Sequence, residues 1–379
     1  MEGIAIRKGH YRQIHELVRA QIMAGVYKPG DKLPTEVELA AAHAVSRGTA
    51  AMALTALARE GLVRRVPRRG TVVVDGAGSV GAVTHRAIAW IQPDIDYTFD
   101  LDVLRGLERS ARGAGYNLLL YLTGTSHHEE EQAIRNARAA GAAGIALCLQ
   151  DGEAYNAEVL RLVLDGFPLV LVDRYLRGIQ CASVQSDNVA GARDLVAELV
   201  SAGHRHICAL VYPPTDTSTI EDRIEGYTQA LADAGILLDR TLVYMAQPFE
   251  GAGDTGRLPE EHIARFATYL DEHPAITAVF ATNAALASLA LQAAERLLLR
   301  IPDDLSVVNI DPLSSVPLTP PLFTCGRQQG YEMGRTAVEL LLEQLAGQPP
   351  RRVLLPMRLQ REGSIAAPRP RTGSTADHG

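Results

Sequence analysis

Charged and polar residues that could bind a ligand rich in hydroxyl groups stand where predicted strands end. They are Asp173 and Arg174 after PLVLV, Asn283 after AVFAT, and Asp311 after SVVNI, with Arg223 near the start of a predicted helix and Phe99 as an aromatic candidate. A carboxylate and a guanidinium can hold adjacent hydroxyl groups through paired hydrogen bonds, and an aromatic ring can cover an apolar ligand face. In the alternative interpretation, Asp173 and Arg174 cap local helix ends and pair with each other.

A second set of residues has the types that contact DNA. Ser46, Arg47 and Thr49 stand at the start of a predicted helix, where side chains and the positive helix end can face phosphates and base edges. Arg68 and Arg69 add charge in a turn between two β-type runs. The types and spacing therefore favour a DNA-reading helix beside a cationic turn.

The elements that must position these residues follow from local signals. Thr35 and Glu38 have the spacing of a capping box, which starts a helix at about residue 35. Ser46 can cap a second helix that ends at Gly61, and residues 62–66 and 71–74 are strand-like. With a preceding helix over 11–25, this order predicts a winged helix-turn-helix. The alternative is a small helical domain with a solvated basic turn.

Charge is distributed unevenly along the 379 residues. Residues 1–75 hold 12 basic and 7 acidic residues, a charge of +5, whereas the whole chain has −7, which leaves −12 for the remainder. We therefore expect affinity for nucleic acid to be confined to the first domain and to weaken with salt.

From residue 87 onward, apolar strands alternate with amphipathic helices. The predicted strands include AIAWIQ, YNLLLYLT, GIALCL, PLVLVD, HICALVY, TLVYMA, AVFAT and LSVVNID. This alternation predicts an α/β fold with parallel sheets covered on both faces, and its length suits two doubly wound lobes with a ligand cleft between them.

The N-terminal motifs resemble those of the GntR family of winged-helix repressors. PGDKLPTEVELA, VSRGTAAMAL and EGLVRRVPRRGT match the family's pattern in order. The resemblance implies DNA contacts by Thr35, Ser46, Arg47, Thr49, Arg68, Arg69 and Gly70. The chain departs from the pattern at Val37 and Ala51, where arginine is usual, and at Gly48, where threonine is common.

Residues from about 86 to 363 resemble the effector domain of LacI/GalR regulators, which is related in fold to periplasmic sugar-binding proteins. FPLVLVDR, VQSDNVAGA, SAGHRHI, DRIEGY and LTPPLFTCGRQQGYEMG follow the family's order. The resemblance implies a ligand site of Phe99, Asp173, Arg174, Thr219, Arg223, Asn283, Asp311 and Gln328. Ala284 and Pro312 depart from the family's pattern. A GntR-type head on a LacI-type body resembles the arabinose-repressor architecture.

The expected organisation has four parts. Residues 1–75 form the DNA-binding domain, 76–85 a Gly-rich linker, 86–365 the two-lobed effector and dimerisation domain, and 366–379 a frayed tail. The linker contains GAGSVG, a formal dinucleotide-loop pattern, but a strand rather than a helix is predicted after it, which favours a linker.

We expect no cofactor, no metal site and no catalytic residue. His127, His128 and Glu129 to Glu131 are interpreted as a solvated helix start rather than a metal cluster. His204 is interpreted as structural, and the four cysteines as buried reduced thiols. No lysine follows Lys32, which excludes a pyridoxal-phosphate enzyme body in the sequence given.

The sequence thus predicts a homodimeric bacterial transcription repressor that binds operator DNA and senses a sugar or sugar derivative. A sugar-processing enzyme and a regulator that senses a nucleoside or purine remain alternatives. A sugar-binding carrier is disfavoured because residues 1–13 lack the apolar core of a secretion signal, so we expect a cytoplasmic protein with no membrane partner.

Overall fold

The computed structural model describes residues 14–22, 24–28, 30–59, 62–66, 70–74, 86–95, 98–150, 156–213, 216–247, 258–313 and 323–369. The chain divides into two compact units, residues 1–85 and 86–379, which are described separately below. The expected linker over 76–85 lies outside the described residues, as do Arg68 and Arg69.

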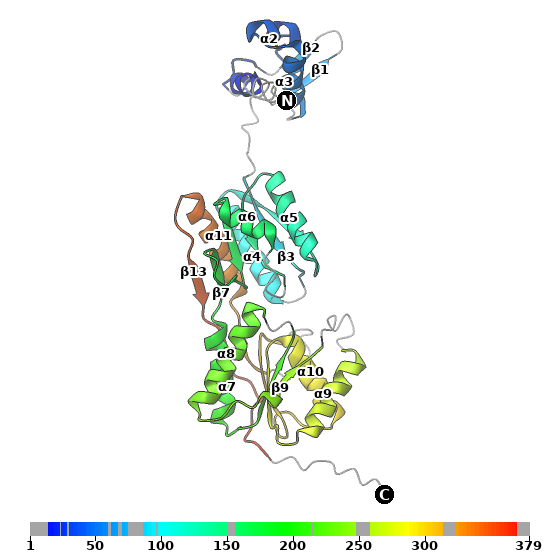
Figure 1. Ribbon diagram of the computed structural model, residues 1–379, viewed down its shortest axis with the longest axis vertical. Helices are drawn as coiled ribbons and strands as arrows, with labels where there is room; N and C mark the ends of the chain where they lie inside the picture. The colour runs from blue at the N-terminus through cyan, green and yellow to red at the C-terminus, as the bar shows by residue number, and fades with distance from the viewer. Residues whose placement is uncertain are drawn as a thin grey trace. The chain divides into compact units, whose positions relative to one another are not determined.

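The first unit is built on helices and a hairpin (Figure 1). Residues 14–22 are helical, and α2 (Glu36–Ala42) and α3 (Arg47–Arg59) follow. The predicted capping box is present, because Thr35 accepts a hydrogen bond from the Glu38 N–H while the Glu38 carboxylate accepts one from the Thr35 N–H. Strands β1 (Val63–Val66) and β2 (Gly70–Val73) pair antiparallel, which completes the predicted winged helix-turn-helix.

The second unit contains two lobes, each with a six-stranded sheet. In the first lobe the sheet order is β13-β7-β6-β5-β3-β4, with strands β3 (Arg86–Gln92), β4 (Tyr116–Leu122), β5 (Ala142–Leu147), β6 (Leu169–Val172), β7 (Ala182–Ser186) and β13 (Arg352–Leu355). All of these pairings are parallel. Its helices are α4 (Thr98–Gly113), α5 (His127–Ala139), α6 (Ala157–Leu164) and α11 (Gly330–Leu345).

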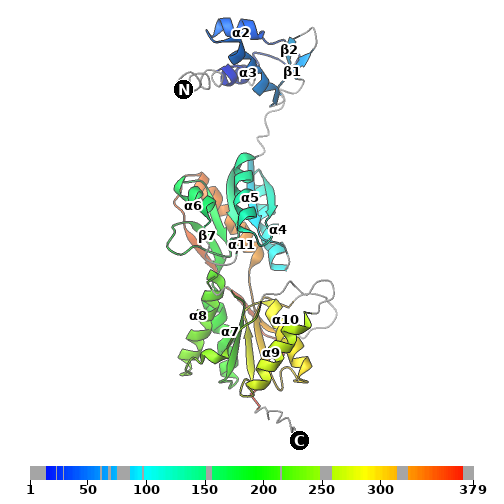
Figure 2. The ribbon, with the colours of Figure 1, turned by 45° about the vertical axis from the view of Figure 1, so that its right-hand side comes forward.

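The second lobe repeats this plan in the order β14-β12-β11-β10-β8-β9. Its strands are β8 (Ile207–Val211), β9 (Val243–Met245), β10 (Ala278–Ala281), β11 (Ser306–Ile310), β12 (Thr324–Arg327) and β14 (Arg358–Gln360), and only β14 pairs antiparallel among them. Helices α7 (Asn188–Ser201) and α8 (Ser218–Asp233) cover one face, and α9 (Glu260–Glu272) and α10 (Ala284–Arg296) cover the other (Figure 2). A short 3-10 turn, η1 (Arg240–Leu242), precedes β9.

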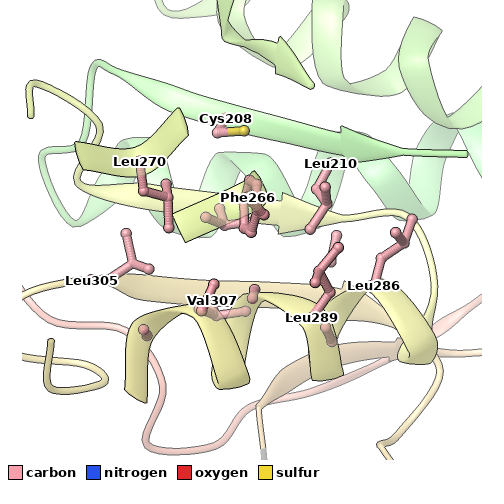
Figure 3. Close-up of a cluster of buried hydrophobic side chains, with 14 of the residues drawn as sticks. Cys208, Leu210, Phe266, Leu270, Leu286, Leu289, Leu305 and Val307 are labelled. Carbon is pink, nitrogen blue, oxygen red and sulfur yellow. The ribbon is translucent and has the colours of Figure 1, made fainter. Parts of the chain in front are cut away.

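Alternation along the buried strands divides the core of each lobe in two. In β8, Cys208 and Leu210 pack with α9 and α10, whereas Ile207 and Ala209 pack with α7 and α8. Figure 3 shows the first of these clusters, with Phe266 of α9 and Leu289 of α10 beside the strand residues. A sheet buried on both faces explains why the strands are continuous apolar runs, as the predicted α/β fold requires.

Three connections carry the chain between the lobes. They lie at residues 186–188, 327–330 and 355–358. The Asp187 N–H donates to the Leu355 carbonyl oxygen at 2.8 Å, and Gln329 Nε2 donates to the Pro356 carbonyl oxygen at 2.7 Å. The three connections are therefore tied to one another by hydrogen bonds.

Two expectations were wrong in detail. The frayed tail does not begin at residue 366, because the Ala366 N–H donates to Ser306 and its carbonyl oxygen lies 2.9 Å from His204 Nε2. Residues 370–379 lie outside the described residues. Glu130 is not solvated at the helix start; it is buried, and it accepts hydrogen bonds from Asn156 Nδ2 and the Gln150 N–H.

Among the described residues, no helix has both the length and the apolar character needed to cross a membrane.

Candidate functional site

The first helical turn of α3 is organised by Ser46 and Thr49. Ser46 Oγ accepts the Thr49 N–H at 3.2 Å and lies 2.8 Å from Thr49 Oγ1, so Ser46 caps α3 as predicted. Ser46 and Arg47 are exposed, whereas Thr49 is only 7% exposed. Thr49 is thus placed to orient Ser46, and Arg47 is the residue of the three that extends a charge into solvent.

Glu36 joins the start of α2 to both α3 and the wing. Its carboxylate accepts Arg47 Nε at 3.3 Å and also pairs with Arg65 of β1. The side chains of Arg47 and Arg65 remain 73% and 64% exposed. Because both guanidiniums share one carboxylate, Arg65 belongs to the same cationic surface as Arg47. Sequence reasoning missed it, although the EGLVRR segment was a usable signal.

Two strand-end aspartates occupy the same unusual backbone conformation in the two lobes. Asp173 follows β6 with φ 67°, and Asp311 follows β11 with φ 63°. A left-handed backbone is strained for most residues other than glycine, and such strain concentrates at functional sites. No helix lies between β6 and β7, so the alternative in which Asp173 and Arg174 cap a local helix is wrong.

Four charged groups from the two lobes interact with one another. Burial lowers the pKa of the Arg223 guanidinium, while the carboxylates of Asp173 and Asp311 oppose that shift and Arg174 adds to it. Burial also raises the pKa of the Asp311 carboxyl, which Arg223 opposes. Asp173, Arg174, Arg223 and Asp311 therefore form a charged cluster whose members interact electrostatically across the lobes, and the Asp222 carboxylate also acts on Arg223.

Within this cluster Asp173 has an unused acceptor. Its Oδ1 atom is buried and has no hydrogen-bond partner among the described residues. Asp311, by contrast, accepts the Gln328 N–H at 3.1 Å through Oδ1 and Gln328 Nε2 at 2.6 Å through Oδ2. A buried acceptor without a donor costs about 1–3 kcal/mol, so a ligand hydroxyl group that donates to Asp173 Oδ1 would remove this cost.

Gln328 connects the cluster to the first lobe. Its Oε1 accepts a hydrogen bond of 2.8 Å from Ser186 Oγ, at the end of β7. Arg223 is fixed in the second lobe, where Nε donates to Asn188 Oδ1 and an Nη atom donates to the Thr282 carbonyl oxygen, both at 2.8 Å. Asn188, Ser186 and Thr282 were not predicted; only the quoted VQSDNVAGA segment pointed towards the first two.

The remaining predicted residues lie on elements next to the charged cluster. Thr219 is buried one turn before Arg223 on α8, and Arg174 donates to the Leu149 carbonyl oxygen. Asn283 follows Thr282, and its side chain accepts the Leu286 N–H at 2.9 Å, so it caps α10. Phe99 is half-buried in the first turn of α4 and lies against the backbone of Gly330, near Gln328 in the chain.

A second set of contacts crosses between the lobes beside the cluster. Tyr175 donates its hydroxyl hydrogen to Asp222 Oδ1 at 2.9 Å, and its N–H donates to Ser218 Oγ at 3.2 Å. Arg177 forms an ion pair with Glu221. The Arg352 guanidinium lies 4.0 Å from the centre of the Tyr175 ring. The contacts of Tyr175 and Arg177 hold α8 of the second lobe against the segment that carries Asp173 and Arg174, and the Arg352 contact packs the Tyr175 ring within the first lobe.

Comparisons with known proteins agree with this architecture. Residues 10–73 match the family model of bacterial regulatory proteins of the gntR family, and residues 196–365 match that of the periplasmic binding protein-like domain. The chain is 28% identical over 355 residues to the arabinose metabolism transcriptional repressor of Geobacillus stearothermophilus, covering 88% of this chain and 91% of the relative. It is 28% identical over 263 residues to the transcriptional repressor CytR of Escherichia coli strain K12, covering 69% and 74%.

A solved structure shares the fold of the body. A LacI family transcriptional regulator from Enterococcus faecium superposes with a TM-score of 0.62 at 24% identity, covering 75% of this chain and all of that one.

The winged-helix head, the two-lobed body and these relatives define a DNA-binding transcription regulator rather than an enzyme. The chain combines a gntR-type head with a periplasmic-binding-protein-like effector domain, and the arabinose metabolism repressors have a similar architecture.

Proposed function

We propose that this chain is a homodimeric, cytoplasmic repressor of carbohydrate-use genes whose operator affinity is set by a sugar or sugar derivative. The effector binds between the two lobes of residues 86–365 and contacts Asp173, Arg174, Arg223 and Asp311. Phe99, Thr219, Asn283 and Gln328 complete the site. The arabinose metabolism repressor, at 28% identity over most of both chains, supports a carbohydrate effector.

The observation that carries the proposal is the buried Oδ1 atom of Asp173, which lacks a donor among the described residues. A sugar hydroxyl supplies such a donor. A neutral polyol brings no further charge into this buried group, whereas a phosphate or a carboxylate would bring a negative charge close to Asp173 and Asp311.

On DNA, each head inserts the start of α3 into a major groove. Ser46 and Arg47 contact the duplex, Thr49 acts through Ser46, and the segment of Thr35 and the wing residues Arg68, Arg69 and Gly70 meet phosphates. Two heads of a dimer bind half-sites about 34 Å apart or a multiple of that.

Effector binding favours the arrangement in which Tyr175 and Asp222 join the lobes, and this arrangement moves the paired heads out of register with the operator. By linkage, an effector that weakens operator binding tenfold is itself bound tenfold less well by the DNA complex, a coupling of about 1.4 kcal/mol.

The test screens pentoses, hexoses, their phosphates and nucleosides for an increase in the unfolding temperature of the full chain, since a ligand bound only by the folded state stabilises it. The ligands that bind are then added to an operator complex. A neutral sugar that releases DNA without being converted supports the proposal. A stabilising nucleoside favours a nucleoside sensor, and turnover of the sugar favours an enzyme; either result rejects the proposal.

A further inference from the structure

The two faces of α3 are different in kind. Ala50, Ala53, Leu54 and Leu57 are buried at the spacing i, i+3, i+4, i+7, and they pack into the core of the head. The same spacing recurs on the outward side, in a stripe formed by Gly48, Ala51, Met52 and Thr55. We call these four residues the α3 stripe. Met52, the one large apolar side chain within it, is 55% exposed.

The α3 stripe offers apolar groups rather than hydrogen-bond donors. Gly48 has no side chain, Ala51 presents a methyl group and Met52 a thioether. The Thr55 hydroxyl donates its hydrogen to the Ala51 carbonyl oxygen at 2.7 Å, so that donor is already used inside the helix. Among the described side chains of α3, Arg47 is the only cation, and it lies at the end of the stripe.

Exposed cations lie at the start of α3 and on the neighbouring strand β1. Arg47 begins α3, and Arg64 and Arg65 are exposed on β1 of the wing, with Arg65 linked to Arg47 through Glu36. The first 75 residues carry a charge of +5. An apolar stripe with cations near its N-terminal end suits the major groove of DNA, where phosphates line the edges and the floor carries the C5 methyl groups of thymine.

We propose that the α3 stripe reads thymine C5 methyl groups, with Met52 and Thr55 as the specificity-determining side chains. The proposal rests on the proposed placement of α3 in a major groove. Each operator half-site then contains A·T pairs whose methyl groups lie under the stripe. The cations of the head supply most of the affinity, and the stripe supplies sequence preference at those pairs.

Replacing single thymines by deoxyuridine tests this directly, because the exchange removes one methyl group and leaves every hydrogen-bonding group of the base pair in place. A half-site is first selected from random duplexes with the full-length protein. Dissociation constants are then measured at one fixed salt concentration for duplexes with one uracil at a time. We expect one or two positions per half-site at which binding weakens about fourfold, the equivalent of about 0.8 kcal/mol for one buried methyl group.

Variants assign the methyl contact to the stripe. In Met52→Ala or Thr55→Ser, the sensitive position should lose its response to uracil while binding to the unmodified duplex weakens about fourfold. Thr55→Ser removes only a methyl group. Leu17→Ala is the matched control, since Leu17 is an exposed apolar residue of the helix over 14–22, and we expect it to keep the full response.

The outcomes separate the stripe from the wider function. If the protein selects a specific duplex but no thymine position responds to uracil, or if the response persists unchanged in both stripe variants, the α3 stripe does not read methyl groups and the repressor proposal survives. If no duplex is bound at all, both proposals fail. Thermal unfolding of each variant shows whether the head is still folded, and Thr55→Ser keeps the test valid should Met52→Ala unfold it.

Discussion

The Tyr175 hydroxyl group, in the first lobe, donates a 2.9 Å hydrogen bond to Oδ1 of Asp222, in the second. Asp222 immediately precedes Arg223, and Tyr175 immediately follows Arg174, so the bond joins the segments that supply Asp173, Arg174 and Arg223. Burial raises the pKa of the Asp222 carboxyl. Tyr175 therefore connects the two lobes through this hydrogen bond.

Tyr175→Phe removes the hydroxyl group that bonds Asp222 and keeps the aromatic ring. We expect effector affinity to fall about five- to tenfold, in line with about 1–1.4 kcal/mol for a lost hydrogen bond to a carboxylate that is partly solvated. Titration calorimetry measures this affinity with the effector that the ligand screen identifies. Tyr121→Phe, another half-buried tyrosine of the first lobe, is the control. Equal affinities of Tyr175→Phe and the unmodified protein would show that the bond does not favour the ligand-bound arrangement.

Asp173→Asn should weaken effector binding about 10- to 100-fold, because a charge-assisted hydrogen bond to the ligand is replaced by a neutral one. Asparagine tolerates the left-handed backbone found at this position, so the fold should persist. The variant should stay on operator DNA when effector is added. Asp165→Asn, an exposed carboxylate of the same lobe paired with Arg138, should behave as unmodified protein. Normal effector release by Asp173→Asn would remove Asp173 from the site.

Arg65→Ala should weaken operator binding and lower the slope of log affinity against log salt by about one, since one phosphate contact is lost. Effector affinity should not change, because Arg65 lies in the first unit. Filter binding at several salt concentrations measures the slope. Arg105→Ala removes the same charge from α4 of the second unit, and we expect no change in its slope. A slope unchanged in Arg65→Ala would exclude Arg65 from the DNA-binding surface.

Gly334→Ala should destabilise the second unit by about 1–3 kcal/mol through overpacking. A Cβ atom at Gly334 of α11 would lie 2.1 Å from the Val103 carbonyl oxygen of α4, and backbone cannot move aside cheaply. Gly113→Ala, at the end of α4, is the matched control: nothing lies within 4 Å, and helix propensity favours alanine by about 1 kcal/mol. Urea unfolding compares the two, and equal midpoints would argue against close packing of α4 on α11.

His204 should make stability depend on pH. Its ring nitrogens lie 2.8 Å from Thr277 Oγ1 and 3.0 Å from Ser306 Oγ, and burial lowers its pKa below the ordinary value of 6.5. The unfolded chain therefore takes up a proton from about pH 6.5 downward, before the folded protein does. The free energy of unfolding should fall as pH drops through this window, by up to about 1.4 kcal/mol per pH unit.

Urea unfolding between pH 7.5 and 5.5 tests the role of His204. His204→Gln should flatten this part of the pH profile, and His206→Gln, which changes an exposed neighbour, should not. If His206→Gln alone flattened the profile, the assignment to His204 would be wrong.

Most elements of the fold could be predicted because each has a recognisable local sequence pattern. The strands of the second unit that were predicted are apolar runs, since both faces of their sheets are buried. Strands β7 and β12 were missed because ASVQS and TCGR are not apolar runs, although all five residues of β7 are buried. Their polar side chains are tolerated because neighbours satisfy them, as when Ser186 donates to Gln328.

The sequence by itself determined the helix caps, the strand and helix periods and the cationic first 75 residues, because each depends on side chains only a few positions apart. It also placed Asp173 and Asp311 at strand ends. Only the tertiary structure decided that α11 and β13 return to the first lobe after the second is complete, since periodicity does not say which sheet an element joins. That return brings Ser186 close to Gln328, and the meeting of the two lobes brings Asp173 close to Arg223; no local pattern encodes contacts between residues so far apart in the chain.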